Sequence, residues 1–246
     1  QSEHSYEKFA DGCPETNPEL PWDMYVFDET LRLFTSGTTG RQKSVCLTSI
    51  NEVLSAHDVM INFPLSFTDR TMNTTPWFHR GGLHSGGITP TLYAGGTVVV
   101  QRKFQAEQTL DCIEQQGLTF VIGVPNVLEL MAEAQQKQPR NLHSLHGIVT
   151  MGSPLERADC IRYQKILTQR IFNGYGTTET FWNTFLRPDD LPENAGSAGR
   201  ACVDDDVRIV KLYDDHIAKP NDLAARNGNE VGEVIIRSDA KSAAFY

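Results

Sequence analysis

The densest group of chemically useful side chains lies in residues 33–45, which read LFTSGTTGRQKSV. Backbone N–H groups in a glycine-rich turn form a concave surface that binds anions, and hydroxyl groups add donors that rotate to suit phosphate oxygens. The residues that would form this cradle are Thr35, Ser36, Gly37, Thr38, Thr39 and Gly40. Lys43 adds a mobile positive charge. The string suits a polyphosphate, and taken alone it suits a Ser/Thr-rich surface turn about equally well.

The segment does not match the common nucleotide-binding loop GxxxxGK[ST]. Gln42 stands where that motif requires Gly, and Gly37 and Gly40 are too close together. A P-loop ATPase, which would cleave ATP to ADP, is therefore the least favoured hypothesis.

A second group lies at residues 173–179, which read NGYGTTE. Small neighbours leave one ring face of Tyr175 open to a flat ligand, although a GYG turn alone is more often structural. Glu179 offers a carboxylate of the kind that bridges Mg²⁺ to phosphates. Without the upstream loop, Glu179 would be interpreted as an acidic residue that stabilises a helix N-terminus.

Four more segments accompany these two in a fixed order: residues 75–79 (TPWFH), 151–155 (MGSPL), 196–201 (GSAGRA) and 232–238 (GEVIIRS). Together they resemble the signatures of adenylate-forming enzymes, the superfamily of acyl- and aryl-CoA synthetases, luciferases and peptide-synthetase adenylation domains. The first loop is similar to their TSGTTGxPKGV signature. It departs at Gln42, where Pro is usual, and at Ser44, where Gly is usual. The resemblance extends over residues 31–246.

The resemblance implies an AMP-forming acid–thiol ligase that uses ATP, Mg²⁺ and coenzyme A. A small carboxylic acid would attack the α-phosphate of ATP to give an acyl-adenylate, and the thiol of coenzyme A would then take the acyl group. Positioning and charge stabilisation would govern the first step. A ligase that loads a carrier protein and a non-catalytic nucleotide-binding module remain as alternatives.

The resemblance also implies roles for individual residues. Lys43 and the loop amides would offset phosphate charge, Thr178 would contact the α-phosphate, and Glu179 would hold Mg²⁺. His79 would border the acyl and thiol tunnel. Amino-acid-activating members carry Asp at the position of His79, so an acid with an uncharged tail is expected. The residues expected along the adenine are Gly152, Ser153, Pro154, Asn173, Gly174, Tyr175 and Gly176.

The hydrophobic pattern predicts an α/β fold. A short strand at residues 30–34 should run into the loop, and a helix should follow it. Ser49 and Glu52 have capping-box spacing. One apolar stripe of that helix would comprise Ile50, Val53, Leu54, His57 and Ile61.

Beyond that helix, strands and helices alternate. Strands are expected at residues 96–100, 118–124, 145–150 and 169–172, and helices at 105–116, 125–134 and 155–167. This order predicts a parallel-rich sheet flanked by helices, with ligands at the carboxyl ends of its strands. Strands at 207–210 and 231–236 predict a smaller β-rich section near the C-terminus.

We expect a lead-in segment at residues 1–24, an α/β nucleotide- and acyl-binding core at 25–200 and the β-rich section at 201–246. By resemblance, a TGD-like motif, a hinge and a small C-terminal domain with a catalytic Lys would follow Tyr246. The chain is therefore expected to be the central part of a large N-terminal domain that turns over poorly by itself.

Composition sets broad limits. The 246 residues carry a formal net charge of −9, which argues against a nucleic-acid-binding surface. No apolar run reaches the ~20 residues that a membrane span needs. The five cysteines are scattered and form no CxxC pair, which favours a reducing, cytoplasmic setting.

Overall fold

The computed structural model describes residues 23–36, 42–239 and 241–243, together with residues 8, 10–16 and 19 near the N-terminus. Its centre is a seven-stranded sheet with the order β4-β3-β5-β6-β7-β8-β9. These strands are β3 (Arg70–Asn73), β4 (Thr97–Val98), β5 (Phe120–Gly123), β6 (Gly147–Met151), β7 (Ile171–Thr177), β8 (Phe181–Leu186) and β9 (Arg200–Ala201). Strands β3 to β7 pair in parallel, whereas β8 and β9 are antiparallel to their neighbours.

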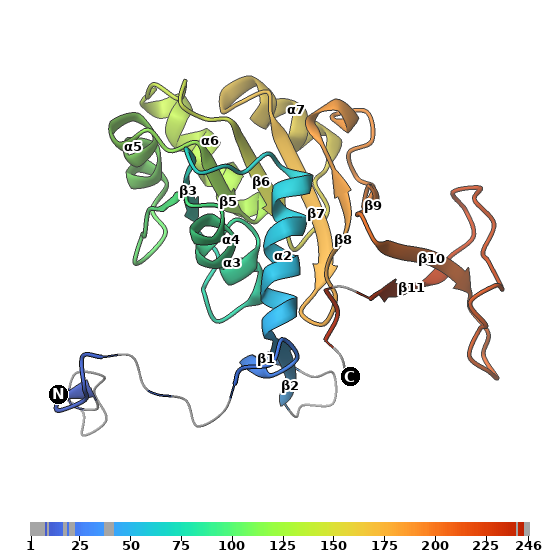
Figure 1. Cartoon of the computed structure of the whole chain (residues 1–246). Helices are drawn as coiled ribbons and strands as arrows, with labels where there is room; N and C mark the ends of the chain where they lie inside the picture. The colour runs from blue at the N-terminus through green and yellow to red at the C-terminus, as the bar shows by residue number, and fades with distance from the viewer. Residues whose placement is uncertain are drawn as a thin grey trace.

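Helices cover both faces of this sheet (Figure 1). The helices are α2 (Ser49–Asn62), α3 (Arg80–His84), α4 (Ile88–Tyr93), α5 (Ala106–Gln116), α6 (Pro125–Lys137) and α7 (Arg157–Ile166). Side chains alternate along β5, so that Val121 packs with residues of α5, α6 and α7. Phe120 and Ile122 point to the other face and pack with Val59 of α2. The core therefore has two layers with the sheet between them.

Two small antiparallel sheets complete the fold. One joins β1 (Glu29–Ser36) to β2 (Gln42–Thr48), and its buried face is formed by Leu33, Val45 and Leu47. The other joins β10 (Asp205–Lys211) to β11 (Gly232–Ser238) and projects beyond β9 (Figure 1). A short 3-10 helix, η1 (Pro188–Asp190), follows β8. No helix in the described ranges is long and apolar enough to cross a bilayer.

The predicted fold class is confirmed: a mostly parallel sheet lies between helices, and an antiparallel pair lies near the C-terminus. Strands β3, β8 and β9 and helices α3 and α4 were not predicted. The helix predicted after the glycine-rich loop is present as α2, but β2, which lies between them and pairs with β1, was not predicted.

The prediction for α2 is wrong in two respects. Its capping contact lies one residue earlier, where the Thr48 N–H donates to Asn51 Oδ1 at 3.0 Å. The predicted apolar stripe is not the buried face, since His57 and Ile61 are exposed. The residues of the buried face are Asn51, Ser55, Ala56, Asp58, Val59 and Asn62.

One buried carboxylate ties two strand starts together at the amino edge of the sheet. Asp69 precedes β3, and its Oδ2 accepts from the Ser66 N–H at 2.7 Å and from the Ser66 hydroxyl at 2.9 Å. Its Oδ1 lies 2.9 Å from Nδ1 of His146, which precedes β6. Burial would raise the pKa of Asp69, but hydrogen bonds from Thr119, Ser66 and His146 outweigh it and lower the pKa.

We predict that Asp69→Asn lowers the free energy of unfolding by about 1–3 kcal/mol, because bonds to a charged acceptor are lost. The folded-state pKa lies below the unfolded value. This stabilisation is therefore present above about pH 4 and is lost as the pH falls through the folded-state pKa. Urea titrations across acidic pH measure both effects. The matched control is Asp215→Asn, which removes an exposed Asp–His pair and should leave stability nearly unchanged; equal losses in both variants would contradict the prediction.

Candidate functional site

A cleft of about 390 Å³ opens at the carboxyl ends of β6 and β7. It is lined by Gly152, Ser153, Pro154, Asn173, Gly174, Tyr175, Gly176, Gly196, Ser197 and Ala198. The structure thus brings together all the residues that the sequence placed along an adenine. Ligands of parallel α/β sheets bind at this edge.

Close backbone packing shapes the wall that carries Tyr175. A Cβ added to Gly174 would lie 2.9 Å from the Phe185 ring, and one added to Gly176 would collide with the carbonyl oxygen of Phe181. Only glycine therefore lets β7 approach β8 on both sides of Tyr175. The Tyr175 ring remains 38% exposed and lines the cleft. An exposed ring face of this kind can stack on a flat ligand, and the predicted contact of Tyr175 with adenine stays a prediction.

The cleft is also lined by Gly196, Ser197 and Ala198, to which the sequence assigned no role. The Gly196 N–H donates to the Leu155 carbonyl at 2.8 Å, which ties this loop to the segment at Gly152. The GSAGRA segment could have indicated that these residues line the cleft, because a glycine-rich loop allows a ligand to approach the backbone closely.

Thr178 and Glu179 lie in the turn that joins β7 to β8. Hydroxyl contacts between Thr177 and Thr180 close this turn at 3.0 Å. The Glu179 carbonyl accepts from the Ala243 N–H at 2.8 Å. Among the described residues no hydrogen bond to the Glu179 carboxylate is found, and the residue is only partly buried. An oxygen ligand of this kind fits a hard divalent cation.

The predicted phosphate loop spans the hairpin between β1 and β2. Thr35 pairs with Lys43 across the two strands, and Ser36 ends β1. Gly37, Thr38, Thr39 and Gly40 lie outside the described residues. Lys43 is exposed and is not part of the cleft wall.

The hairpin nevertheless adjoins the Glu179 turn. Ala243, whose N–H binds the Glu179 carbonyl, also packs against the apolar cluster of β1 and β2. The β1–β2 hairpin and the turn that carries Glu179 therefore share a contact through Ala243.

His79 precedes α3 as its N-cap residue and is exposed. Its ring centroid lies 4.5 Å from that of Phe78, which is also exposed. The structure does not bring His79 to the wall of the cleft. Its role at the acyl and thiol tunnel stays a prediction.

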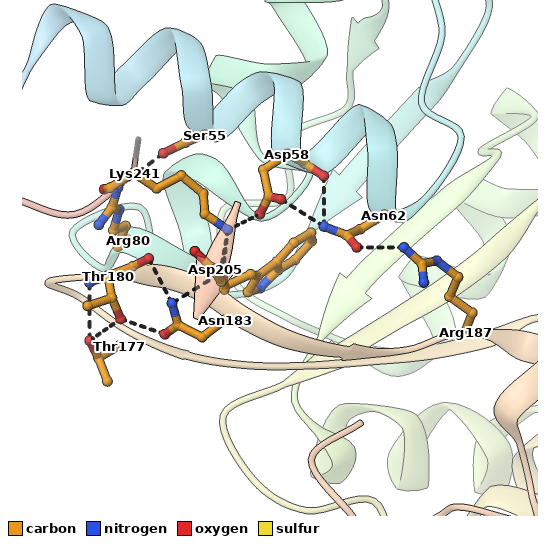
Figure 2. Close-up of polar contacts among 11 residues, drawn as sticks. Ser55, Asp58, Asn62, Arg80, Thr177, Thr180, Asn183, Arg187, Asp205 and Lys241 are labelled. Atoms are coloured by element: carbon orange, nitrogen blue, oxygen red, sulfur yellow. Dashed lines mark hydrogen bonds and ion pairs between the residues drawn. The ribbon is translucent and has the colours of Figure 1, made fainter. Parts of the chain in front are cut away.

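A buried charge cluster lies beside the turn (Figure 2). The Lys241 Nζ lies 3.0 Å from Asp58 Oδ2 on α2 and 2.8 Å from Asp205 Oδ2 on β10, and donates to the Trp182 carbonyl at 2.6 Å. The side chains of Lys241, Asp58 and Asp205 are nearly inaccessible to solvent. Burial raises the pKa of Asp58 to about 6, although the Lys241 ammonium pulls it down.

Arg80 extends this cluster to the turn. Its guanidinium donates to the Thr178 carbonyl at 2.7 Å, to the Lys241 carbonyl at 2.9 Å and to Ser55 Oγ at 3.0 Å. Burial lowers the pKa of Arg80 to about 10, against the pull of Glu52, Glu179 and Asp58. None of these supporting residues was predicted. The signal that could have found them is the polar stripe of α2: Asn51, Ser55, Asp58 and Asn62.

The family model described as "AMP-binding enzyme" matches residues 9–245. The chain is 35% identical over 230 residues to indoleacetate–CoA ligase of Aromatoleum aromaticum. This match covers 92% of this chain and 43% of that protein. It is 31% identical over 234 residues to 2-succinylbenzoate–CoA ligase of Bacillus velezensis. That match covers 91% of this chain and 46% of that protein.

Among solved structures, O-succinylbenzoate coenzyme A synthetase from Bacillus subtilis, in complex with ATP and magnesium ion, superposes with a TM-score of 0.76. Sequence identity is 25%, over 94% of this chain and 46% of that chain. The chain thus spans less than half the length of these relatives.

We predict that Lys241→Met destabilises the full chain by about 3–5 kcal/mol, because it leaves Asp58 and Asp205 buried without their counter-charge. The loss should be smaller at about pH 5 than at about pH 8, since protonating a carboxylate removes the unpaired charge. Urea unfolding at both pH values measures this. Lys137→Met, at an exposed position, is the matched control. A pH-independent loss equal to that of the control would show that the cluster does not carry the expected charge coupling.

Proposed function

The chain belongs to the family of AMP-binding enzymes, and on that premise we propose that the protein activates a small carboxylic acid with ATP and passes the acyl group to coenzyme A. The observation that carries the proposal is the cleft at the ends of β6 and β7, whose wall contains the Gly152–Pro154 and Asn173–Gly176 segments. A flat ring stacked on Tyr175 would fill it, as the adenine of ATP does by family resemblance.

Residues outside the adenine cleft would bind the phosphates and the metal ion. Lys43 and the loop that begins at Thr35 and Ser36 would neutralise phosphate charge, and Thr178 would contact the α-phosphate. Glu179 fits a magnesium ligand because its carboxylate has no hydrogen-bond partner among the described residues and is partly exposed. Mg²⁺, when bound, would offset charge on the phosphate oxygens. The protein groups supply orientation and electrostatic stabilisation, which phosphoryl transfer chiefly requires.

We propose that the acid carries an aromatic ring. The relatives named above are ligases for indoleacetate and 2-succinylbenzoate, which both contain one. His79 stands where amino-acid-activating members have an Asp for the substrate ammonium, which supports an acid without an amino group. The exposed ring of Phe78 beside His79 offers an apolar contact near this position.

Acceptor and compartment belong to the same proposal. Coenzyme A is favoured over a carrier protein because both named relatives are CoA ligases. A cytoplasmic setting is supported by Cys46, Cys112, Cys160 and Cys202, which are free thiols. Nothing in the net charge of −9 supports a nucleic-acid partner.

The full protein, with any native sequence that flanks these 246 residues, should catalyse pyrophosphate–ATP exchange that depends on an added acid. We expect the highest rates with acids that carry an aromatic ring, such as arylacetic acids, from a panel that also holds fatty acids and amino acids. Product analysis should find AMP, and a thioester of coenzyme A rather than of a carrier protein. Nucleotide binding without any acid-dependent exchange would instead support a non-catalytic module, and release of ADP would reject the adenylation chemistry.

Tyr175→Ala should raise the dissociation constant for AMP on the order of tenfold, because stacking on an aromatic ring is worth about 1–3 kcal/mol per base. Calorimetric titration of the full protein measures this. Tyr93→Ala serves as the control, since Tyr93 is a half-exposed tyrosine on α4 that binds His57. Equal AMP affinities in the two variants would remove Tyr175 from the proposed adenine site.

A further inference from the structure

We propose that Arg80 is a positioning residue that fixes the Thr178–Glu179 turn, and thereby the metal-binding geometry, without contacting a ligand itself. The inference rests on the proposed function, in which Glu179 holds Mg²⁺ and Thr178 contacts phosphate. It adds a residue outside the sequence motifs to that site.

The guanidinium joins three separate segments. One terminal nitrogen, Nη1, donates to the Thr178 carbonyl at 2.7 Å. The other, Nη2, donates to the Lys241 carbonyl at 2.9 Å and to Ser55 Oγ on α2 at 3.0 Å. The guanidinium is planar and rigid, so its two terminal nitrogens form a fork of fixed geometry. The positions of the groups that bind this fork are therefore fixed relative to one another. Lysine could not reproduce this, since a single ammonium on a flexible stem has no fixed fork.

Arg80 also contacts the far end of the turn. Its Cζ lies 5.1 Å from the centroid of the Phe181 ring, within range of a cation–π contact. Phe181 has φ = +63°, a left-handed conformation that a bulky residue adopts only when its surroundings enforce it. Trp182 stacks on the Phe181 ring at 5.1 Å. Arg80 therefore holds the turn at Thr178 and at Phe181, with Glu179 between them.

The manner of contact leaves the Glu179 carboxylate available. Arg80 binds backbone carbonyls, and no hydrogen bond between Arg80 and the Glu179 carboxylate is found in the structure. A guanidinium paired with that carboxylate would compete with a cation for its oxygens. The arrangement fixes the backbone and leaves the carboxylate oxygens for a metal.

A second anchor makes the same turn dependent on the segment after β11. The Ala243 N–H donates to the Glu179 carbonyl at 2.8 Å, and Asn51 Nδ2 donates to the Ser242 carbonyl at 3.0 Å. Arg80 binds the Lys241 carbonyl of this same segment. The segment and Arg80 thus bind each other as well as the turn.

The test uses Arg80→Met in the full protein. The concentration of Mg²⁺ that gives half-maximal acid-dependent exchange should rise on the order of 10- to 100-fold, as for the outer-shell partners of other metal ligands. Binding of Mn²⁺ with ATP, followed by electron paramagnetic resonance, should weaken by a similar factor. Affinity for adenosine, which lacks the phosphate that Thr178 would contact, should stay within about twofold, because Arg80 is not part of the cleft wall.

The matched control is Arg140→Met. Arg140 is also nearly buried and binds Asp111 Oδ1 at 2.9 Å and the Gln138 carbonyl at 2.7 Å. It follows α6, which runs from the carboxyl end of β5 back toward the amino end of β6, away from the cleft. Its removal should cost stability without changing the Mg²⁺ requirement. If the two variants respond alike to metal, or if Arg80→Met weakens adenosine and Mn²⁺ binding equally, Arg80 is only a structural residue.

Arg80→Lys keeps the experiment decisive if Arg80→Met does not fold. The variant retains the charge but loses the fork, so the same rise in Mg²⁺ requirement is expected, and an unchanged requirement overturns the inference. Failure of the proposed function is seen separately, as absence of acid-dependent exchange in the unmodified protein. The Mn²⁺ titration then still compares Arg80→Met with Arg140→Met.

Discussion

The arrangement of the site depends on one buried charge cluster, in which the Lys241 ammonium lies between Asp58 and Asp205. These residues come from the segment after β11, from α2 and from β10, so the cluster joins the C-terminal hairpin to the helix that covers the main sheet. Desolvating such groups costs several kcal/mol per ion and is offset only when each is paired. If one of these elements moved away, a buried charge would lose its partner and its desolvation would no longer be offset. The three elements are therefore held in a single arrangement.

The two parts of the site are therefore supported in different ways. The cleft beside Tyr175 is built by local backbone packing, because Gly174 and Gly176 let β7 lie close to β8. The neighbouring turn takes its position from partners far away in the sequence. Asn183 shows the link, since its Nδ2 lies 3.3 Å from both the Thr180 carbonyl and Asp205 Oδ2.

This difference explains what could be predicted from the sequence. The parallel core was predictable from alternating patterns and local stop signals, such as Gly117, which ends α5 with φ = +64°. The cleft was predictable because its residues lie in short contiguous motifs. The face of α2 was not, since Asn51, Ser55, Asp58 and Asn62 repeat at helical spacing but are polar. Sequence patterns predict that the apolar stripe of a helix is the buried one. That prediction fails when ion pairs and hydrogen bonds to distant residues allow a polar stripe to be buried instead. Strand β2 was missed for a related reason, because its pairing with β1 is tertiary information.

A polar face on α2 also suits the chemistry better than an apolar one would. Apolar side chains pack without direction, so a helix held only by them can shift slightly at little cost. Lys241 and Arg80 instead bind the carbonyls of Trp182 and Thr178 at 2.6 and 2.7 Å, and such bonds weaken steeply once distance or angle departs from the optimum. Metal and phosphate groups need placement within about 0.5 Å. Directional contacts are therefore concentrated where the β7–β8 turn must be accurate, while the apolar core carries the rest of the fold.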